Sequence, residues 1–181
     1  MKWTYKVKKF LLDIILPNTC PICNDFIGYD EYICEKCLSN LPLVEENICN
    51  RCKRKECICT DLFYDNCISF VYYEDSGKDG LLSFKLKGLF NFAEYFAQKA
   101  VEMLKENGIL DEIDLITNVP MTAQKEYERG YDQAFEFAKM ISMFSGLPLD
   151  GMVLIKEKGN VVQHELSSKE RKEKAYEAFE L

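Results

Sequence analysis

The sequence predicts an α/β protein built from a small cysteine-rich metal-binding module and a larger parallel-sheet domain with flanking helices. Eight of the nine cysteines fall between residues 20 and 59. After residue 61, short apolar stretches alternate with amphipathic helical patterns, which is typical of strands joined by crossover helices. The length of 181 residues, 48% hydrophobic and 29% charged, suits one globular domain plus a small module and excludes disorder or coiled coil as the main class.

Residues 1–17 are predicted to form a short amphipathic helix that packs on the protein. Apolar residues between positions 10 and 15 share one helical face, and the lysines at 2, 6 and 9 lie outside it. Asp13 interrupts the apolar stretch and no cleavage site follows, which excludes a signal peptide and leaves a membrane anchor as the alternative. No stretch approaches the ~20 apolar residues of a spanning helix. We therefore expect a cytoplasmic protein with reduced thiols.

The first four cysteines form two C-x2-C pairs separated by ten residues; they are Cys20, Cys23, Cys34 and Cys37. Each pair can wrap its backbone so that both thiolates point at one ion, and two such knuckles complete a tetrahedral, structural four-sulfur site. Four thiolates fit zinc or iron, and zinc is the expectation for a site without redox partners.

The next four cysteines are spaced more tightly, as C-x2-C-x4-C-x-C; they are Cys49, Cys52, Cys57 and Cys59. They predict a second four-sulfur site, so we expect two structural zinc ions and a module that unfolds without metal. Cys67 lies in an apolar run and is expected to be a buried free thiol. The single histidine, His164, lies far along the chain, which argues against mixed cysteine and histidine ligation.

The formal net charge of −7 disfavours nucleic-acid binding over the whole surface. The charge is uneven, because residues 1–60 hold 9 basic and 8 acidic side chains, whereas residues 61–181 hold 14 and 22. Candidates for nucleic-acid contact lie within the second cysteine set; they are Arg51, Lys53, Arg54 and Lys55. The alternative is a solvated loop that keeps a small module soluble.

The rest of the chain is predicted to alternate between strands and helices. Helices are expected at residues 89–107 and 131–145, where apolar residues recur at helical spacing and a glycine follows. The other expected elements are strands at residues 68–73, 113–119 and 152–155, a turn at residues 74–80, and a serine-capped helix at residues 167–174.

Ligands of a parallel sheet bind at the carboxyl ends of its strands, which directs attention to the loop at residues 120–133. Arg129 could offer a planar fork to a phosphate, and Gly130 would let the backbone come close. Taken alone, Arg129 could equally be a surface arginine at a helix start, and His164 an ordinary polar loop residue.

Several motifs follow one another along residues 10–181. They are Pro17 with Cys20-x2-Cys23, Lys85-Leu86-Lys87-Gly88, Val119-Pro120, Arg129-Gly130-Tyr131-Asp132-Gln133-Ala134, Gln163-x2-Leu166-Ser167-x3-Arg171 and Ala178-Phe179. Together they resemble the ComF family of competence proteins, which join a double zinc ribbon to a phosphoribosyltransferase-like domain. The resemblance implies a ribbon at residues 18–62 and a transferase-like domain at residues 63–181. It also implies phosphate or ligand binding by Lys85, Arg129, Gly130, Gln133, Gln163 and Arg171.

The sequence departs from this family at its end. Family members continue into an apolar strand, two aspartates and a Thr-Thr-Gly loop that holds phosphoribosyl pyrophosphate, whereas this sequence stops at Leu181. Ala175 and Lys125 also stand where an asparagine and an arginine are usual. We therefore expect a C-terminally incomplete sheet domain, or one that a partner completes. Phosphoribosyl pyrophosphate and magnesium are implied for full-length relatives.

Three functions stay open at this point. The resemblance implies a role in DNA uptake, with contacts to single-stranded DNA and to a helicase partner. A second reading is phosphoribosyl transfer, in which Lys85 and Arg129 would neutralise pyrophosphate oxygens, although the missing loop argues against activity. The third is a zinc-stabilised scaffold for protein interactions, and an iron electron carrier is a disfavoured fourth.

Overall fold

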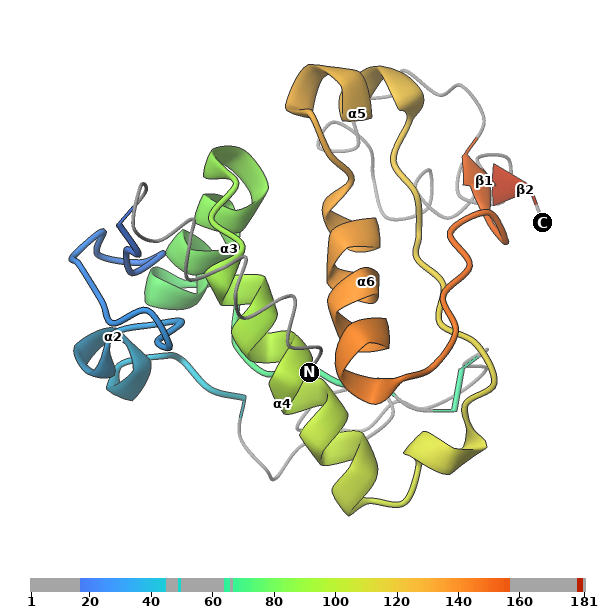
Figure 1. The fold of residues 1–181 in the computed structure, drawn as a ribbon, viewed down its shortest axis with the longest axis horizontal. Coiled ribbons are helices and arrows are strands. Elements are labelled where there is room, and N and C mark those ends of the chain that lie inside the picture. Colours follow the sequence, from blue (N-terminus) through green and yellow to red (C-terminus); the bar gives the residue numbers. More distant parts are fainter. Residues whose placement is uncertain (1–16, 45–48, 50–63, 66, 157–178, 181) are drawn as a thin grey trace. The chain divides into compact units, whose positions relative to one another are not determined.

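The computed structural model describes residues 17–44, 49, 64–65, 67–156 and 179–180. In chain order they form helices α2 (Glu35–Ser39), α3 (Asp75–Lys87) and α4 (Asn91–Glu106), the 3-10 helix η1 (Leu110–Glu112), helices α5 (Ala123–Arg129) and α6 (Gln133–Ser145), and strands β1 (Ile155–Lys156) and β2 (Phe179–Glu180) (Figure 1). The chain divides into two compact units, residues 1–100 and residues 101–181.

The core of the first unit is an aromatic cluster on α4. The ring of Phe96 lies 5.5 Å from that of Phe70, 4.9 Å from that of Phe92 and 5.1 Å from that of Tyr95, measured between centroids. Small buried alanines at positions 93, 97 and 100 follow the same face and let other side chains approach the helix. The helix predicted at residues 89–107 is therefore confirmed, with its ends at Asn91 and Glu106.

Helix α3 occupies the segment that the sequence predicts as a turn at residues 74–80, so that prediction is wrong. Its two interior glycines, Gly77 and Gly80, are buried. A Cβ atom on Gly80 would overlap the ring of Phe92, and one on Gly77 would lie 2.5 Å from the carbonyl oxygen of Tyr72. The glycines therefore serve close packing of a helix rather than reversal of the chain.

The strand predicted at residues 68–73 is reduced to a short antiparallel contact. Val71 pairs with Leu43. On either side, the Tyr72 N–H donates to the Pro42 carbonyl at 2.8 Å, and the Val44 N–H donates to residue 70 at 2.9 Å. This contact joins residues 42–44, which follow the first four cysteines, to residues 70–72, which precede α3.

Among the described residues of the second unit, one parallel contact stands in place of the predicted parallel sheet. Ile116 forms a parallel bridge with Leu149, in which the Ile116 N–H donates to the Pro148 carbonyl at 2.9 Å and the Asp150 N–H donates to the Ile116 carbonyl at 3.0 Å. Helices α5 and α6 lie between the two bridged residues in the sequence, so the segment has the connectivity of a strand–helix–strand crossover. The predicted strand at residues 113–119 is limited to this bridge.

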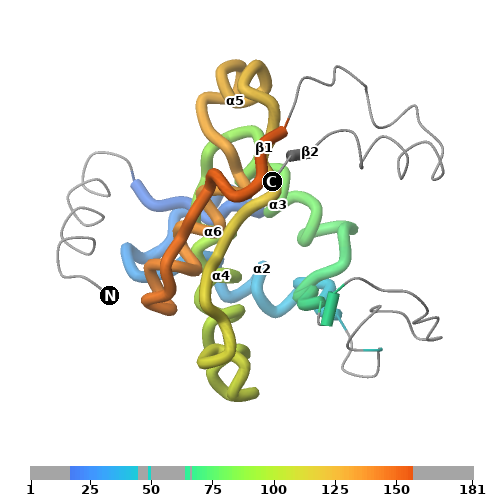
Figure 2. Tube along the Cα trace, turned by 90° about the vertical axis from the view of Figure 1, so that its right-hand side faces the viewer, coloured from blue at the N-terminus to red at the C-terminus, as the bar shows by residue number. Residues whose placement is uncertain are grey.

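The two named strands pair antiparallel, and β1 lies beside β2 in both views (Figures 1 and 2). The strand predicted at residues 152–155 appears as β1, shifted to Ile155–Lys156. The described residues contain no larger sheet. The expectation of a parallel sheet with several strands is therefore not met in the part of the chain that the structure describes.

Helix α6 confirms the helix predicted at residues 131–145, but the preceding loop is not irregular. It contains α5, whose start is capped by the Thr122 hydroxyl, which accepts from the Lys125 N–H at 3.4 Å. Gly130, with a φ of 89°, ends α5 in the left-handed conformation. The helices predicted at residues 1–17 and 167–174, and the domain boundary at residue 62, lie outside the described residues, apart from Pro17.

Within the described residues, no helix has the combination of length and apolar character that a membrane crossing requires.

Candidate metal centre

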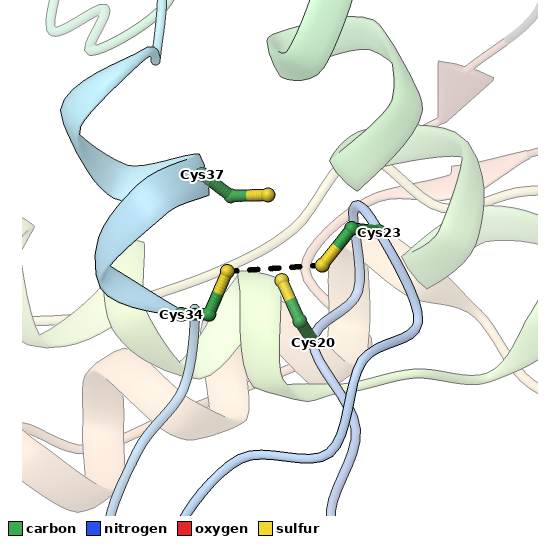
Figure 3. Close-up of side chains that lie close together, drawn as sticks. All are labelled: Cys20, Cys23, Cys34 and Cys37. Atoms are coloured by element: carbon green, nitrogen blue, oxygen red, sulfur yellow. Dashed lines mark hydrogen bonds between the residues drawn. The ribbon is translucent and has the colours of Figure 1, made fainter.

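Four cysteine sulfurs converge in the first unit (Figure 3). The Sγ atoms of Cys20, Cys23, Cys34 and Cys37 all lie within 4.8 Å of one another. Those of Cys23 and Cys34 are 3.7 Å apart. In a tetrahedral zinc site with Zn–S bonds of about 2.3 Å, neighbouring sulfurs stand about 3.8 Å apart, whereas bonded disulfide sulfurs are about 2.05 Å apart. The arrangement is therefore that of a metal site.

Each C-x2-C pair is shaped by its own local backbone. In the first pair, the Cys20 N–H donates to the Asp25 carbonyl at 2.8 Å, and the Asn24 N–H donates to the Cys20 carbonyl at 2.9 Å. Asn24 has a φ of 63°, a left-handed conformation that asparagine tolerates and that closes the turn. In the second pair, Cys34 is the N-cap of α2 and Cys37 lies in its first turn, so the spacing of three places both on one helical face.

Burial and hydrogen bonding give the thiols different proton affinities. Burial alone would raise the pKa of Cys20. The backbone N–H groups of Cys23, Cys34 and Ile22 donate toward its sulfur and bring the pKa down to about 7. For Cys37, burial raises the pKa, and the neighbouring thiols raise it further. Four crowded sulfurs cannot all ionise unless a cation balances their charge, and a divalent ion supplies that balance.

Asn18, two residues before the first ligand, ties the loop between the two cysteine pairs to α4. Its Nδ2 group donates to the carbonyl oxygens of Gly28 and Glu31 at 2.7 and 2.8 Å. Its Oδ1 atom accepts from Asn91 Nδ2 at 2.6 Å, and Asn91 is the first residue of α4. One side chain therefore fixes the loop and attaches it to the helix.

A second polar contact joins the ribbon to α4, two residues before the third ligand. The Tyr32 hydroxyl accepts from Gln98 Nε2 at 2.7 Å. Burial, and next the charge of Glu94, raise the pKa of Tyr32 to about 12. Glu94 is only 2% exposed, so this side of α4 buries a carboxylate beside the ribbon. The segments that carry the metal ligands are therefore packed against α4 through the side chains of Asn18 and Tyr32.

The remaining predicted metal ligands and nucleic-acid contacts lie largely outside the described residues. Cys49 is half-buried. The second set's other cysteines and all four basic candidates are not described; they are Cys52, Cys57, Cys59, Arg51, Lys53, Arg54 and Lys55. The second four-sulfur site therefore stays a prediction. Cys67 is a free thiol, but it is half-buried, so the expectation of full burial is wrong.

The predicted phosphate ligands fall in two places. Arg129, Gly130 and Gln133 lie together in the second unit, where α5 ends and α6 begins, and Arg129 and Gln133 are half-buried. Lys85 is exposed in the last turn of α3, in the first unit. Gln163 and Arg171 lie outside the described residues, as does His164.

Asp132 stands within the motif at residues 129–134, and the motif alone gives it no role. Its Oδ1 atom accepts from the N–H groups of Ala134 and Phe135 at 2.8 and 3.1 Å, and its Oδ2 atom accepts from the Met121 N–H at 2.9 Å. An aspartate directly before an amphipathic helix is an N-cap signal that could have predicted this. Because its carboxylate occupies these N–H groups, they are not free to bind a phosphate.

Comparison with protein families agrees with the geometry of the sulfur cluster. Residues 11–67 match the double zinc ribbon domain. The matched stretch contains the four clustered cysteines and the complete second set. Together, the match and the cluster indicate a zinc-binding protein. No curated protein and no solved structure matched the chain.

Proposed function

We propose that the protein is a cytoplasmic, ComF-like zinc protein of the DNA-uptake machinery, which contacts single-stranded DNA and a helicase-type partner. The observation that carries the proposal is the double zinc ribbon at residues 11–67 with a preassembled four-sulfur site. Two structural zinc ions would hold the ribbons rigid. The motifs that resemble the ComF family, taken in their order along the chain, supply the cellular process.

The DNA contact is assigned to the second cysteine set because of its charge. Four basic residues follow one another within residues 51–55, and one acid, Glu56, opposes them. A zinc-bound knuckle would hold these cations in a fixed arrangement, which favours contact with successive phosphates of a flexible strand. The contact is not sequence-specific, since it depends on the backbone charge.

Fluorescence anisotropy of a labelled fifteen-nucleotide thymidine strand, titrated with zinc-loaded protein, tests the DNA contact. Four phosphate contacts predict a loss of affinity of about 50-fold between 50 and 200 mM salt. Simultaneous reversal of the four basic residues at positions 51, 53, 54 and 55 to glutamate should abolish binding. Reversal of the exposed Lys87 and Lys105, which lie outside the cysteine module, is the control and should have little effect. Binding that is absent, or that salt does not weaken, would overturn this contact.

One observation favours phosphoribosyl transfer as a second candidate. The parallel bridge between Ile116 and Leu149 encloses α5 and α6 in the connectivity of a crossover unit, as a nucleotide-binding sheet would. The segment with Arg129 and Gln133 lies within this crossover. We expect pyrophosphate release from phosphoribosyl pyrophosphate and magnesium to stay at background if the protein acts through the DNA contact proposed above. Release that depends on Arg129 would instead support the transferase, and background release with intact zinc binding would favour a scaffold.

A further inference from the structure

The loop between the two cysteine pairs of the first ribbon exposes aromatic rings among acids. Phe26 is 77% exposed and Tyr29 is 55% exposed. Three exposed acids lie beside them, Asp25, Asp30 and Glu31. We call residues 25–31 the acidic loop. Phe26 and Tyr29 stand three positions apart among these acids, so the loop offers two exposed rings together with negative charge, an arrangement that suits contact with cations.

The acidic loop has a fixed shape. Glu31 Oε2 accepts from the Gly28 N–H at 3.0 Å, and Asn18 holds the carbonyl oxygens of both residues. The Ile27 N–H donates to the Asn18 carbonyl at 3.1 Å, and Phe26 pairs antiparallel with Thr19. Because the backbone is already ordered, binding at this loop would lose little conformational entropy.

The charge of the first ribbon excludes a polyanion from this surface. Residues 17–44 contain four acids, at positions 25, 30, 31 and 35, and a single base, Lys36, which gives 1 − 4 = −3. A zinc ion held by four thiolates adds a further −2. Phosphates are repelled by such a field, whereas lysine and arginine side chains are attracted. Residues 51–55, by contrast, hold four bases and no acid, so this stretch differs in charge from the first ribbon.

We propose that the acidic loop is a docking surface for a basic segment of a partner protein. Arginine or lysine side chains of that segment would lie over the rings of Phe26 and Tyr29, where a cation is attracted to the ring face. The acids at positions 25, 30 and 31 would pair with neighbouring cations of the same segment. The proposal goes beyond the DNA contact and does not depend on it, because the two surfaces differ in both residues and charge.

Amide NMR of the zinc-loaded full chain, titrated with a hexa-arginine peptide, tests the proposal. The largest shift changes should fall on residues 25–31. Phe26→Ala, which removes an exposed ring and no charge, should raise the dissociation constant about two- to fivefold. Leu86→Ala is the matched control, since Leu86 is 68% exposed on α3 and distant in the sequence from residues 25–31. It should leave the dissociation constant unchanged. Asp30→Asn should weaken binding at low salt more than at high salt.

Three results would overturn the proposal. In the first, shift changes spread evenly over the acidic surface and Phe26→Ala has no effect. In the second, the thymidine strand shifts residues 25–31, which would make the loop a nucleic-acid surface. In the third, the protein alone shows concentration-dependent shifts at these amides, which would make the occupant a second copy. If the thymidine strand does not bind but the peptide shifts residues 25–31, the proposed DNA contact is wrong and the proposal for the acidic loop stands.

Discussion

Replacing Asp132 by alanine should destabilise the second unit by about 3 kcal/mol. The carboxylate is 8% exposed and accepts three backbone N–H groups, from Ala134, Phe135 and Met121. Loss of the N-cap of α6 costs about 1–2 kcal/mol. The Met121 N–H, left without its acceptor in a partly buried place, costs about 1–2 kcal/mol more.

Two further variants separate geometry from charge. Asp132→Asn keeps one oxygen for the helix N–H groups but turns an amide NH2 toward the Met121 N–H, so it should cost about half as much as alanine. Asp150→Ala is the control, because the Asp150 carboxylate accepts from one N–H, that of Met152, at 2.8 Å on an exposed turn. It should cost about 0.5 kcal/mol or less.

Urea unfolding followed by circular dichroism gives the free energies, and amide hydrogen exchange at Ala134 and Phe135 locates the loss. The exchange measurement is needed because the two units need not unfold together. If Asp132→Ala and Asp150→Ala cost the same, the capping role of Asp132 is refuted. If Asp132→Asn costs nothing, the hydrogen bond from the Met121 N–H makes no contribution to stability.

Three other predictions concern the first unit. Tyr32→Phe should lower its stability by about 1–3 kcal/mol, because the partly buried Gln98 amide loses its acceptor, and thermal unfolding of the zinc-loaded protein measures this. Gly80→Ala should destabilise the first unit by about 1–3 kcal/mol, because the added methyl group overlaps the Phe92 ring. The same change stabilises an ordinary helix by about 1 kcal/mol, so a rise in melting temperature would contradict this prediction. Simultaneous replacement of Cys34 and Cys37 by serine leaves two thiolates and should lower the zinc content measured by mass spectrometry by one ion per chain; an unchanged content would rule out the described cluster as a zinc site.

Helices with a regular apolar face were predictable from the sequence. In α4, burial follows the 3.6-residue period, α6 has apolar residues at helical spacing in the sequence, and left-handed glycines, Gly108 and Gly146, follow the two helices. Both signals are local, so they are visible in one sequence. The positions of the first four metal ligands were also predictable, since each C-x2-C pair is shaped by its own turn.

Helices without such a face were missed. Residues 74–80 have the composition of a turn, and only the close approach of Phe92 and Tyr72 explains why glycines lie inside α3. Helix α5 is polar and exposed, so its sequence has no apolar periodicity to detect. The hydrogen bond from Asn91 to Asn18 joins residues 73 positions apart, and no sequence pattern indicates such a pair.

The attachment of the first ribbon to α4 has a consequence for its metal affinity. Zinc release from the full chain must also disturb the contacts of Asn18 with Asn91 and of Tyr32 with Gln98, because the ion holds the loop that carries Asn18's acceptors. A fragment that ends before residue 64 keeps all eight cysteines of the two sets but has neither helical partner. Such a peptide should bind zinc more weakly than the whole protein, and one extended through Glu106 should regain the difference. The ion's affinity is thus a property of the first unit as a whole, and α4, which begins 54 residues after Cys37 (91 − 37), contributes to it.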